Sequence, residues 1–264
     1  MTRIFTAVGN RVVGALAEAG ALWQLAASTV ERTLAGPFRG ERVRFGETVL
    51  QTVRAGYDSL PLVALLSVLI GMILALQSAY QLDQMGALSL VARLVAITMT
   101  RELAPLITAI IVAGRVGSAI AAELGTMKVS QEVDALTVMG IDPVSYLVVP
   151  RILGLLVSVP CLVLFSNLIG IAGGAIIAVT TLGLGGRTYV LDSLNALIME
   201  DIVIGLIKAV VFAGIIGLVG CQQGLATRGG AEEVGRATTT SVVRAIVLVI
   251  TADLFVTAIY YVKG

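Results

Sequence analysis

Residues 59–82 read SLPLVALLSVLIGMILALQSAYQL, a run of 24 residues without a charged side chain that lies between Asp58 and Asp83. About 20 consecutive apolar residues are enough for a helix to cross the hydrocarbon core of a bilayer. The whole chain follows the same pattern, because 57% of its 264 residues are hydrophobic and only 13% are charged. Soluble domains carry about 25% charged residues, so the sequence predicts an all-α integral membrane protein.

Other apolar stretches complete the predicted membrane domain. Residues 152–186 form an uncharged run of 35 residues, which we interpret as one span followed by a glycine-rich exit at 183–186. Residues 202–227 contain one charge, Lys208, and residues 245–262 contain one, Asp253. With the stretch discussed next, the predicted spans lie at about 59–82, 100–124, 150–180, 202–226 and 243–262.

The stretch 84–125 allows two interpretations, because it is apolar but holds five charged residues and is too long for one span. Either a short interfacial helix at about 86–98 leads into a span at about 100–124, or a hairpin turns at 101–105. With five spans and a cytoplasmic N-terminus, twelve of the 18 basic residues fall on the cytoplasmic side and three on the far side. This positive-inside bias favours five spans, with the N-terminus inside and the C-terminus outside.

Residues 1–45 form a separate element before the predicted transmembrane domain 46–264. Their apolar side chains recur at helical spacing and are followed by the single tryptophan, Trp23. The apolar stripe consists of Ile4, Phe5, Val8, Val12 and Leu16. We expect an amphipathic helix in the headgroup plane, ended by Gly36-Pro37 and followed by a basic connector with Arg39, Arg42 and Arg44 and a short helix at about 46–57. A soluble N-terminal arm is the alternative.

The composition also excludes several kinds of function. The chain has no histidine, which excludes Ser-His-Asp triads and other histidine-based acid–base catalysis, and histidine-ligated metals. Its formal charge is only +1, so no basic field indicates a nucleic-acid partner. We therefore expect a transport protein rather than an enzyme, with no catalytic residue and no metal site.

Five charged side chains lie within the predicted spans, where an ionisable group costs roughly 2.5–3.5 kcal/mol at mid-bilayer. They are Arg101, Glu102, Arg115, Lys208 and Asp253. Such groups must pair with one another or face water. They therefore predict either a polar patch in a substrate-conducting cavity or structural ion pairs such as Lys208 with Asp253, and the two interpretations are compatible.

Small residues repeat every four positions in three of the spans. The stripes are Ala113, Gly117, Ala121 and Gly125; Ser166, Gly170 and Gly174; and Gly205, Ala209, Ala213 and Gly217. Stripes of this kind let helix backbones approach closely. They predict either a tight bundle or a seam between two copies of the chain.

Residues 126–143, between the second and third spans, are more polar and predict a short amphipathic cytoplasmic helix at about 126–140. Met127, Val133, Leu136 and Met139 would form its apolar face. Such a helix is either a docking element for a partner or a plain surface helix. The motif G-x-x-x-x-G-K-[ST] does not occur in the chain, so an ATPase that drives transport would be another subunit.

Two long motifs resemble the MlaE (YrbE-type) permeases, the membrane subunits of lipid-transporting ABC systems. The first begins with RELAP at 101–105 and continues LITAIIVAGRVGSAIAAELGTMKVSQEVDALTVMGIDPVSYLVVPR, and the second is EDIVIGLIKAVVFAGIIGLVGCQQGLATRGGAEEVGRATTTSVV at 200–243. The resemblance covers roughly residues 60–262. It implies an N-terminal interfacial helix, five spans and a homodimeric core in a bacterial inner membrane.

The resemblance also implies partners and sites. The partners are a cytoplasmic ATPase dimer that binds ATP and Mg²⁺, a hexameric MCE-domain protein on the far side and often a small STAS-domain protein; this chain itself would bind no cofactor. Charged residues within the spans of the family correspond to Arg101, Glu102, Lys208 and Asp253 in this chain. The segment that docks on the ATPase in the family corresponds to residues 123–143. The residues expected to couple to the ATPase are Glu123, Lys128, Glu132, Asp134 and Met139.

The resulting hypothesis is ATP-driven transport of phospholipid between inner and outer membranes. Leu74, Leu76 and Tyr80 would contact acyl chains in a cavity between two copies, while Arg101 and Lys208 would lie near polar headgroups. An ion-coupled secondary transporter, with Glu102, Lys208 and Asp253 as a relay, is the rival. Against the rival, five spans do not divide into paired inverted repeats. A structural scaffold is a third possibility, but it leaves the buried charges unexplained.

Overall fold

The computed structural model describes the backbone of residues 2–35 and 44–263 and the side chains of residues 17–33 and 44–262. Within these residues every regular element is a helix, and there is no strand. Five stretches are long and apolar enough to cross a membrane, as the sequence predicts. They are Phe45–Asp83, Leu88–Val129, Val144–Thr180, Met199–Leu225 and Ala231–Val262. The all-α membrane fold is thereby confirmed, while the N-in, C-out orientation stays a prediction.

The first two of these stretches are each built from several helical segments. The first joins α2 (Phe45–Tyr57) to α3 (Leu60–Asp83). The second runs without a hairpin from the 3₁₀ turn η2 (Leu88–Leu90) through α4 (Val91–Thr98), α5 (Ala104–Val112) and α6 (Ser118–Val129). Two π turns, η3 (Met99–Leu103) and η4 (Ala113–Gly117), connect α4 to α5 and α5 to α6.

The hairpin alternative at 101–105 is therefore wrong, and the chain follows the other alternative, in which a helix at about 86–98 leads into the span at about 100–124. The interfacial position of that first helix stays a prediction. Pro105 lies at the start of α5, where Ala104 N–H bonds to Met99 O in the five-residue step of a π helix. This wider turn leaves room for the proline ring, which would clash in a regular helix. The resulting helical path is about 63 Å long at 1.5 Å per residue, roughly twice the hydrocarbon thickness of about 30 Å.

The third and fourth spans follow the predicted positions closely. The π turn η5 (Val144–Val148) leads into α8 (Val149–Thr180), and α10 extends from Met199 to Leu225. Between them lies a short helix that the sequence analysis missed, α9 (Gly186–Ala196). Tyr189 of α9 is buried against the bundle, and this burial raises the pKa of its hydroxyl to about 12. The hydroxyl donates a hydrogen bond of 3.4 Å to Ile171 O of α8.

The segment expected to form one helix at 126–140 is two pieces. α6 continues to Val129, the chain turns at Ser130 and Gln131, and α7 covers only Glu132–Val138. Gln131 has φ 62°, a left-handed conformation that reverses the chain. The Ser130 hydroxyl bonds to Thr126 O at 2.9 Å, which helps to close the last turn of α6.

The predicted apolar face is divided as well. Val133 and Leu136 are buried, whereas Met139 is 65% exposed because it lies after the end of α7.

The two ends of the chain differ from the hydropathy prediction for separate reasons. α11 (Ala231–Lys263) begins a dozen residues before the predicted span. Hydropathy did not indicate its first turns because they are polar, and Glu232 and Glu233 lie near the positive end of the helix dipole. α1 (Thr2–Ala35) is one long helix whose C-terminal part contacts η5 and α10. Its predicted interfacial position stays a prediction. The side chains of the stripe Ile4, Phe5, Val8, Val12 and Leu16, and the connector residues Arg39 and Arg42, lie outside the described residues.

The small-residue stripes pack helices against each other within the chain. A Cβ atom added to Gly71 of α3 would collide with Gly170 O of α8, and the hydroxyls of Ser67 and Ser166 lie 2.7 Å apart on the same two helices. A Cβ atom on Gly220 of α10 would lie 3.0 Å from Gly117 O. The structure thereby shows close packing within one chain, and a seam between two copies stays a prediction.

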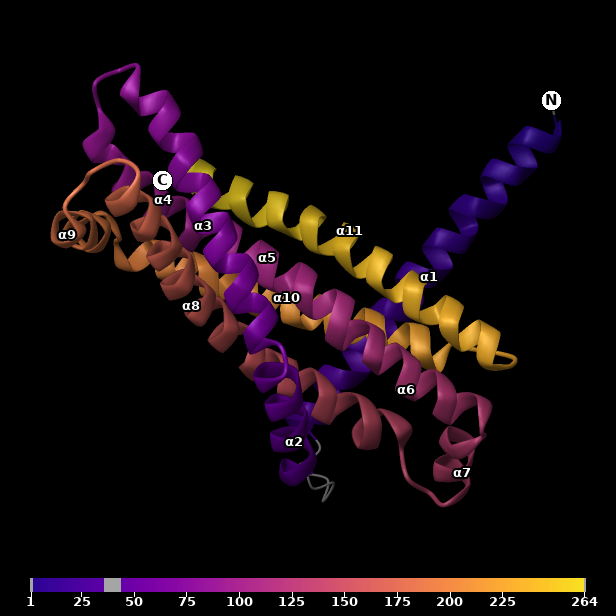
Figure 1. The fold of residues 1–264 in the computed structure, drawn as a ribbon. Coiled ribbons are helices and arrows are strands. Elements are labelled where there is room, and N and C mark those ends of the chain that lie inside the picture. The colour runs from indigo at the N-terminus through magenta and orange to yellow at the C-terminus, as the bar shows by residue number, and fades with distance from the viewer. Residues whose placement is uncertain (1, 36–43, 264) are drawn as a thin grey trace.

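The long helices other than α1 run roughly side by side, whereas α1 crosses them and projects away from the bundle (Figure 1). The ends of the side-by-side helices define two ends of the bundle. We call one the α7 end, which holds α7 and the start of α11. The other is the C-terminal end, which holds α4, α9 and the last turns of α11. α7 and the C-terminus thus lie at opposite ends, as the three candidate spans between them require.

Candidate functional site

Lys208 is the centre of an ion-pair cluster between three spans. Its side chain is completely buried, and its ammonium pairs with Glu102 of η3 and lies 2.8 Å from Asp253 Oδ1 of α11. The ammonium also donates to Thr257 Oγ1 at 2.8 Å, and the Thr257 hydroxyl donates to Glu102 Oε1 at 3.2 Å. The predicted Lys208–Asp253 pair is confirmed, with Glu102 as a second carboxylate on the same lysine.

Close approach of two backbones brings this cluster together. A Cβ atom added to Gly205 of α10 would lie 2.6 Å from Thr100 O, so only glycine allows α10 to come this close to η3. Lys208 follows Gly205 by about one helical turn and thereby faces Glu102. Asp253 and Thr257 are four residues apart on α11 and share one face. The buried lysine of α10 is therefore held by groups from two other helical segments, η3 and α11.

A second ion pair joins η3 to the start of α10. The Arg101 guanidinium pairs with Asp201, whose side chain is almost completely buried. The other carboxylate oxygen of Asp201 accepts the Ile198 N–H at 3.1 Å, so the same side chain caps α10. Arg101 and Glu102 are neighbours in the sequence but bond to different partners on α10. The sequence analysis missed Asp201, although an acidic residue at the edge of a predicted span is a typical helix-start signal.

Arg101 and Glu102 both face a pocket of about 690 Å³ at the C-terminal end of the bundle. Their side chains are 42% and 36% exposed, whereas Lys208 lies behind Glu102 and does not line the pocket. The other lining residues are Met199, Glu200, Val203, Ile204, Thr257, Tyr260 and Tyr261. The pocket thus offers one guanidinium, carboxylates, hydroxyls and apolar surface to a ligand with both polar and apolar parts.

The apolar residues expected to contact lipid lie elsewhere, on α3. Leu76 and Tyr80 are exposed, and Leu74 packs partly against a small core formed by α3, α4 and their neighbours. None of the three is among the residues that line the pocket at Arg101. Their contact with acyl chains stays a prediction.

Arg115, the remaining charged residue within the predicted spans, lies in the π turn η4 and links two spans to each other. Its guanidinium lies 3.3 Å from Asp58 Oδ2 and donates to Ser59 Oγ at 3.0 Å. These partners form the turn between α2 and α3. Arg115 therefore fixes the second span to the first, away from the cluster at Lys208.

The residues predicted to couple to an ATPase are divided between two places. Lys128 pairs with Asp134 at 2.7 Å, and Glu132 accepts a hydrogen bond from Ser130 at 2.8 Å, so these residues surround the turn before α7. Glu123 instead bonds to Arg151 of α8 at 3.1 Å. Met139 lies after α7, next to Val138, and both are strongly exposed. Their contact with an ATPase stays a prediction.

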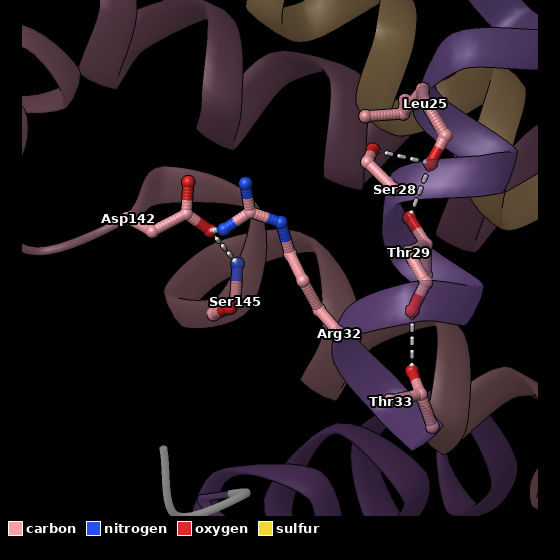
Figure 2. Close-up of polar contacts among 7 residues, drawn as sticks. All are labelled: Leu25, Ser28, Thr29, Arg32, Thr33, Asp142 and Ser145. Atoms are coloured by element: carbon pink, nitrogen blue, oxygen red, sulfur yellow. Dashed lines mark hydrogen bonds and ion pairs between the residues drawn. The ribbon is translucent and has the colours of Figure 1, made fainter. Parts of the chain in front are cut away.

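The loop after α7 is tied to α1 by an ion pair that joins distant parts of the chain. Figure 2 shows Arg32 of α1 reaching Asp142, which also accepts the Ser145 N–H at 2.7 Å. Nearby, the Arg44 guanidinium lies 4.2 Å from the centre of the Tyr146 ring. The ion pair therefore links α1 directly to the loop that follows α7.

Most of the chain is similar in sequence to one family of permeases. Residues 48–259 match the family model described as Permease MlaE. A probable ABC transporter permease of Rickettsia typhi is 39% identical over 211 residues, covering 80% of this chain and 82% of the relative. One from Synechocystis is 36% identical over 214 residues, 81% of each chain. The chloroplastic protein TRIGALACTOSYLDIACYLGLYCEROL 1 of Arabidopsis thaliana is 35% identical over 237 residues, 90% of this chain and 66% of its own.

The matched region covers the five candidate spans except for the first residues of the first and the last residues of the fifth, and it includes the π turns η3 and η4 and the four residues Arg101, Glu102, Lys208 and Asp253. Such a permease is the membrane subunit of an ABC transporter. The permease subunit is not an enzyme and relies on a separate ATPase subunit. This favours ATP-driven transport over the ion-coupled alternative. The chain belongs to the MlaE permease family and is a multi-pass ABC transporter permease.

Proposed function

We propose that this permease moves phospholipid between the inner and outer membranes of a bacterium. The observation that carries the proposal is the pocket of about 690 Å³ at the C-terminal end. Its arginine and hydroxyls suit a phosphate-containing headgroup, and Val203, Ile204 and Met199 suit the adjoining acyl region. The name of the Arabidopsis relative includes trigalactosyldiacylglycerol, a galactolipid, which supports a lipid cargo.

The proposed assembly contains two copies of this chain in the inner membrane. α11 supports this arrangement, because only 11% of its apolar segment is buried, compared with 28–50% for the other four candidate spans. Its exposed face includes Val247, Leu254 and Phe255. A second copy packed on that face would enclose a larger cavity, in which Leu74, Leu76 and Tyr80 would contact acyl chains.

The remaining proposed partners follow from the family resemblance. An ATPase dimer binds at the cytoplasmic side and holds ATP and Mg²⁺, since this chain contains no P-loop motif. An MCE-domain hexamer stands on the far side and carries the lipid onward, and a small STAS-domain protein joins the ATPase. The exposed α7 end, with Val138 and Met139 at its surface, suits the docking of an ATPase.

In the proposed cycle, ATP binding draws the two α7 segments together and narrows the cavity at the C-terminal end. Lipid then passes into the MCE channel, or follows the same path in reverse. Lys208 does not touch the lipid in this scheme. It holds Glu102 in place and thereby positions the polar wall of the pocket.

The test is reconstitution of the permease with its ATPase and MCE partners in liposomes, followed by transfer of labelled phospholipid. We expect ATP-dependent transfer that Arg101→Gln lowers about tenfold, because a hydrogen bond to a charged group contributes about 1.5–3 kcal/mol. Arg93→Gln, a matched change of an exposed arginine on α4, should leave transfer unchanged. Lipid transfer that does not require ATP would overturn the proposal. So would the absence of lipid transfer while ATP is hydrolysed at the normal rate.

A further inference from the structure

One flank of the bundle, between α1, α10 and α11, carries an apolar groove of about 280 Å³. Its lining is entirely apolar: α1 contributes Ala19, Leu22 and Trp23, α10 contributes Ile215 and Leu218, and α11 contributes Leu248. Trp23 is 75% exposed and stands at the edge of the groove. The groove lies near the α7 end, far along α10 and α11 from the pocket at Arg101.

A basic pocket of about 320 Å³ lies next to this groove. It is lined by Arg228, Arg236 and Arg244, with Glu233 as its single acidic residue. Arg244 pairs with Glu18 of α1 at 2.8 Å, and Arg236 lies 3.8 Å from Glu233 with most of its side chain exposed. Within the described part of the chain, the Arg228 side chain has no ion-pair partner. The pocket therefore has an excess of positive charge that the protein leaves unneutralised.

The apolar groove and the basic pocket lie next to each other along α10 and α11. On α10, Val219 of the groove is followed one turn later by Gln223 of the pocket. On α11, which runs the opposite way, Leu248 of the groove is preceded one turn earlier by Arg244. Four residues of helix rise about 6 Å, which is the step from apolar to basic surface on both helices. The arrangement has the polarity of a phospholipid, with a charged end directly above an apolar end.

We propose that this flank binds a phospholipid with an anionic headgroup from the leaflet at the α7 end. The phosphate lies between Arg228 and Arg236, and one acyl chain lies in the groove beside Trp23. A net anionic headgroup is preferred, because a zwitterionic one would bring its ammonium next to three arginines. The bound lipid contacts α1, α10 and α11 together, so it holds α1 against the bundle. This site is separate from the transport pocket and does not depend on what that pocket carries.

Trp23 is the only tryptophan of the chain and provides a direct probe. The full-length permease is placed in nanodiscs of unlabelled phosphatidylcholine that contain rising fractions of a lipid with brominated acyl chains, which quench tryptophan on contact. We expect brominated phosphatidylglycerol to reach half-maximal quenching at a fraction on the order of fivefold lower than brominated phosphatidylcholine. The double variant Arg228→Gln/Arg236→Gln should abolish this difference while leaving quenching by phosphatidylcholine unchanged.

The matched control is Arg187→Gln, which removes the same charge from an exposed arginine at the C-terminal end. It should keep the preference for phosphatidylglycerol. Equal quenching by both lipids in the unmodified protein would overturn the proposal. Absence of quenching by either lipid would also overturn it, since a second copy or another segment would then cover the groove. Relief of quenching by millimolar glycerol 3-phosphate would show that a free phosphate is the ligand rather than a lipid.

Discussion

Lys208 Nζ lies 2.8 Å from Asp253 Oδ1, and the lysine side chain has no contact with solvent. The same ammonium pairs with Glu102, which is 106 residues earlier in the chain. An unpaired lysine at this place would carry the full cost of a charge in the membrane interior. The cluster therefore holds the second, fourth and fifth spans in one arrangement and places Glu102 at the wall of the transport pocket.

Replacement of Lys208 by methionine should destabilise the protein strongly. The change leaves Glu102 and Asp253 facing each other without a cation, and breaking a buried pair costs about 3–5 kcal/mol. We expect the low end, about 3 kcal/mol, because Glu102 is partly exposed. Thermal unfolding in detergent measures the change. Lys128→Met, which removes an exposed pair with Asp134, should cost less than about 1 kcal/mol, and equal effects of the two variants would contradict the assignment.

Removal of the Asp201 carboxylate should separate its two roles. Asp201→Asn loses the charge that pairs with Arg101 but keeps an oxygen that can accept the Ile198 N–H. Asp201→Ala loses both and should be less stable than the asparagine variant by about 1 kcal/mol, the usual contribution of a helix cap. Both variants free Arg101 and should reduce lipid transfer. If alanine and asparagine unfold at the same temperature, Asp201 does not cap α10.

Glycine at position 205 should be required for the close approach of α10 to η3. Gly205→Ala places a Cβ atom 2.6 Å from Thr100 O and should destabilise the protein by about 1–3 kcal/mol. The control lies on the same helix: Gly214 has no atom within 4 Å of an added Cβ, so Gly214→Ala should be neutral or stabilising. Unfolding curves of the two variants would give the comparison, and a tolerated Gly205→Ala would refute the packing argument.

Loss of the Arg32–Asp142 pair should loosen α1 with little change in global stability. Asp142→Asn keeps an oxygen for the Ser145 N–H and removes the charge, so its effect should match that of Arg32→Gln. Both side chains are partly exposed, and such pairs contribute only about 0–1 kcal/mol. Hydrogen exchange should become faster in the C-terminal turns of α1 and remain unchanged in α8. The swapped double variant Arg32→Asp/Asp142→Arg should restore part of the protection, and unaltered exchange in the single variants would argue against the tie.

An acidic residue at the exposed tip of the α7 end should weaken docking of the ATPase. Met139→Asp introduces a charge where we propose that the ATPase binds, and it should reduce transport-coupled ATP hydrolysis without lowering the unfolding temperature. Surface changes usually alter stability by no more than about 0.5 kcal/mol. Met85→Asp is the matched control, because Met85 is even more exposed than Met139 but lies between α3 and η2. The same loss of coupling in both variants would contradict docking at α7.

The position of the spans was readable from the sequence because it depends on local composition. A helix can cross a bilayer only if its backbone groups bond to each other and its side chains are mostly apolar. Long apolar runs such as 59–82 and 152–180 can therefore be recognised as spans from the sequence alone. Polar helical extensions cannot be recognised in this way, and the first dozen residues of α11 were therefore missed. The turn at Gln131 was missed for another reason, since a non-glycine residue with positive φ gives no compositional signal.

The candidate site also contains features that the sequence predicted and features that only the structure shows. The charged residues Arg101, Glu102, Lys208 and Asp253 stood out in the sequence because an ionisable group inside a span is rare and costly. Their pairing was only partly foreseen, and Asp201 was missed. Adjacent residues such as Arg101 and Glu102 point in different directions, so their partners depend on which helix faces each side.

The sequence by itself determined that the protein is helical and membrane-spanning, because hydrophobic length is a property of single segments, and its two long motifs indicated the permease family. Only the tertiary structure decided which charges meet. Lys208 reaches Glu102 because Gly205 lets α10 approach the carbonyl of Thr100. The small-residue stripes were visible in the sequence, but the helix that each one faces depends on contacts between segments far apart in the chain. Those contacts arise from packing, which no local pattern specifies.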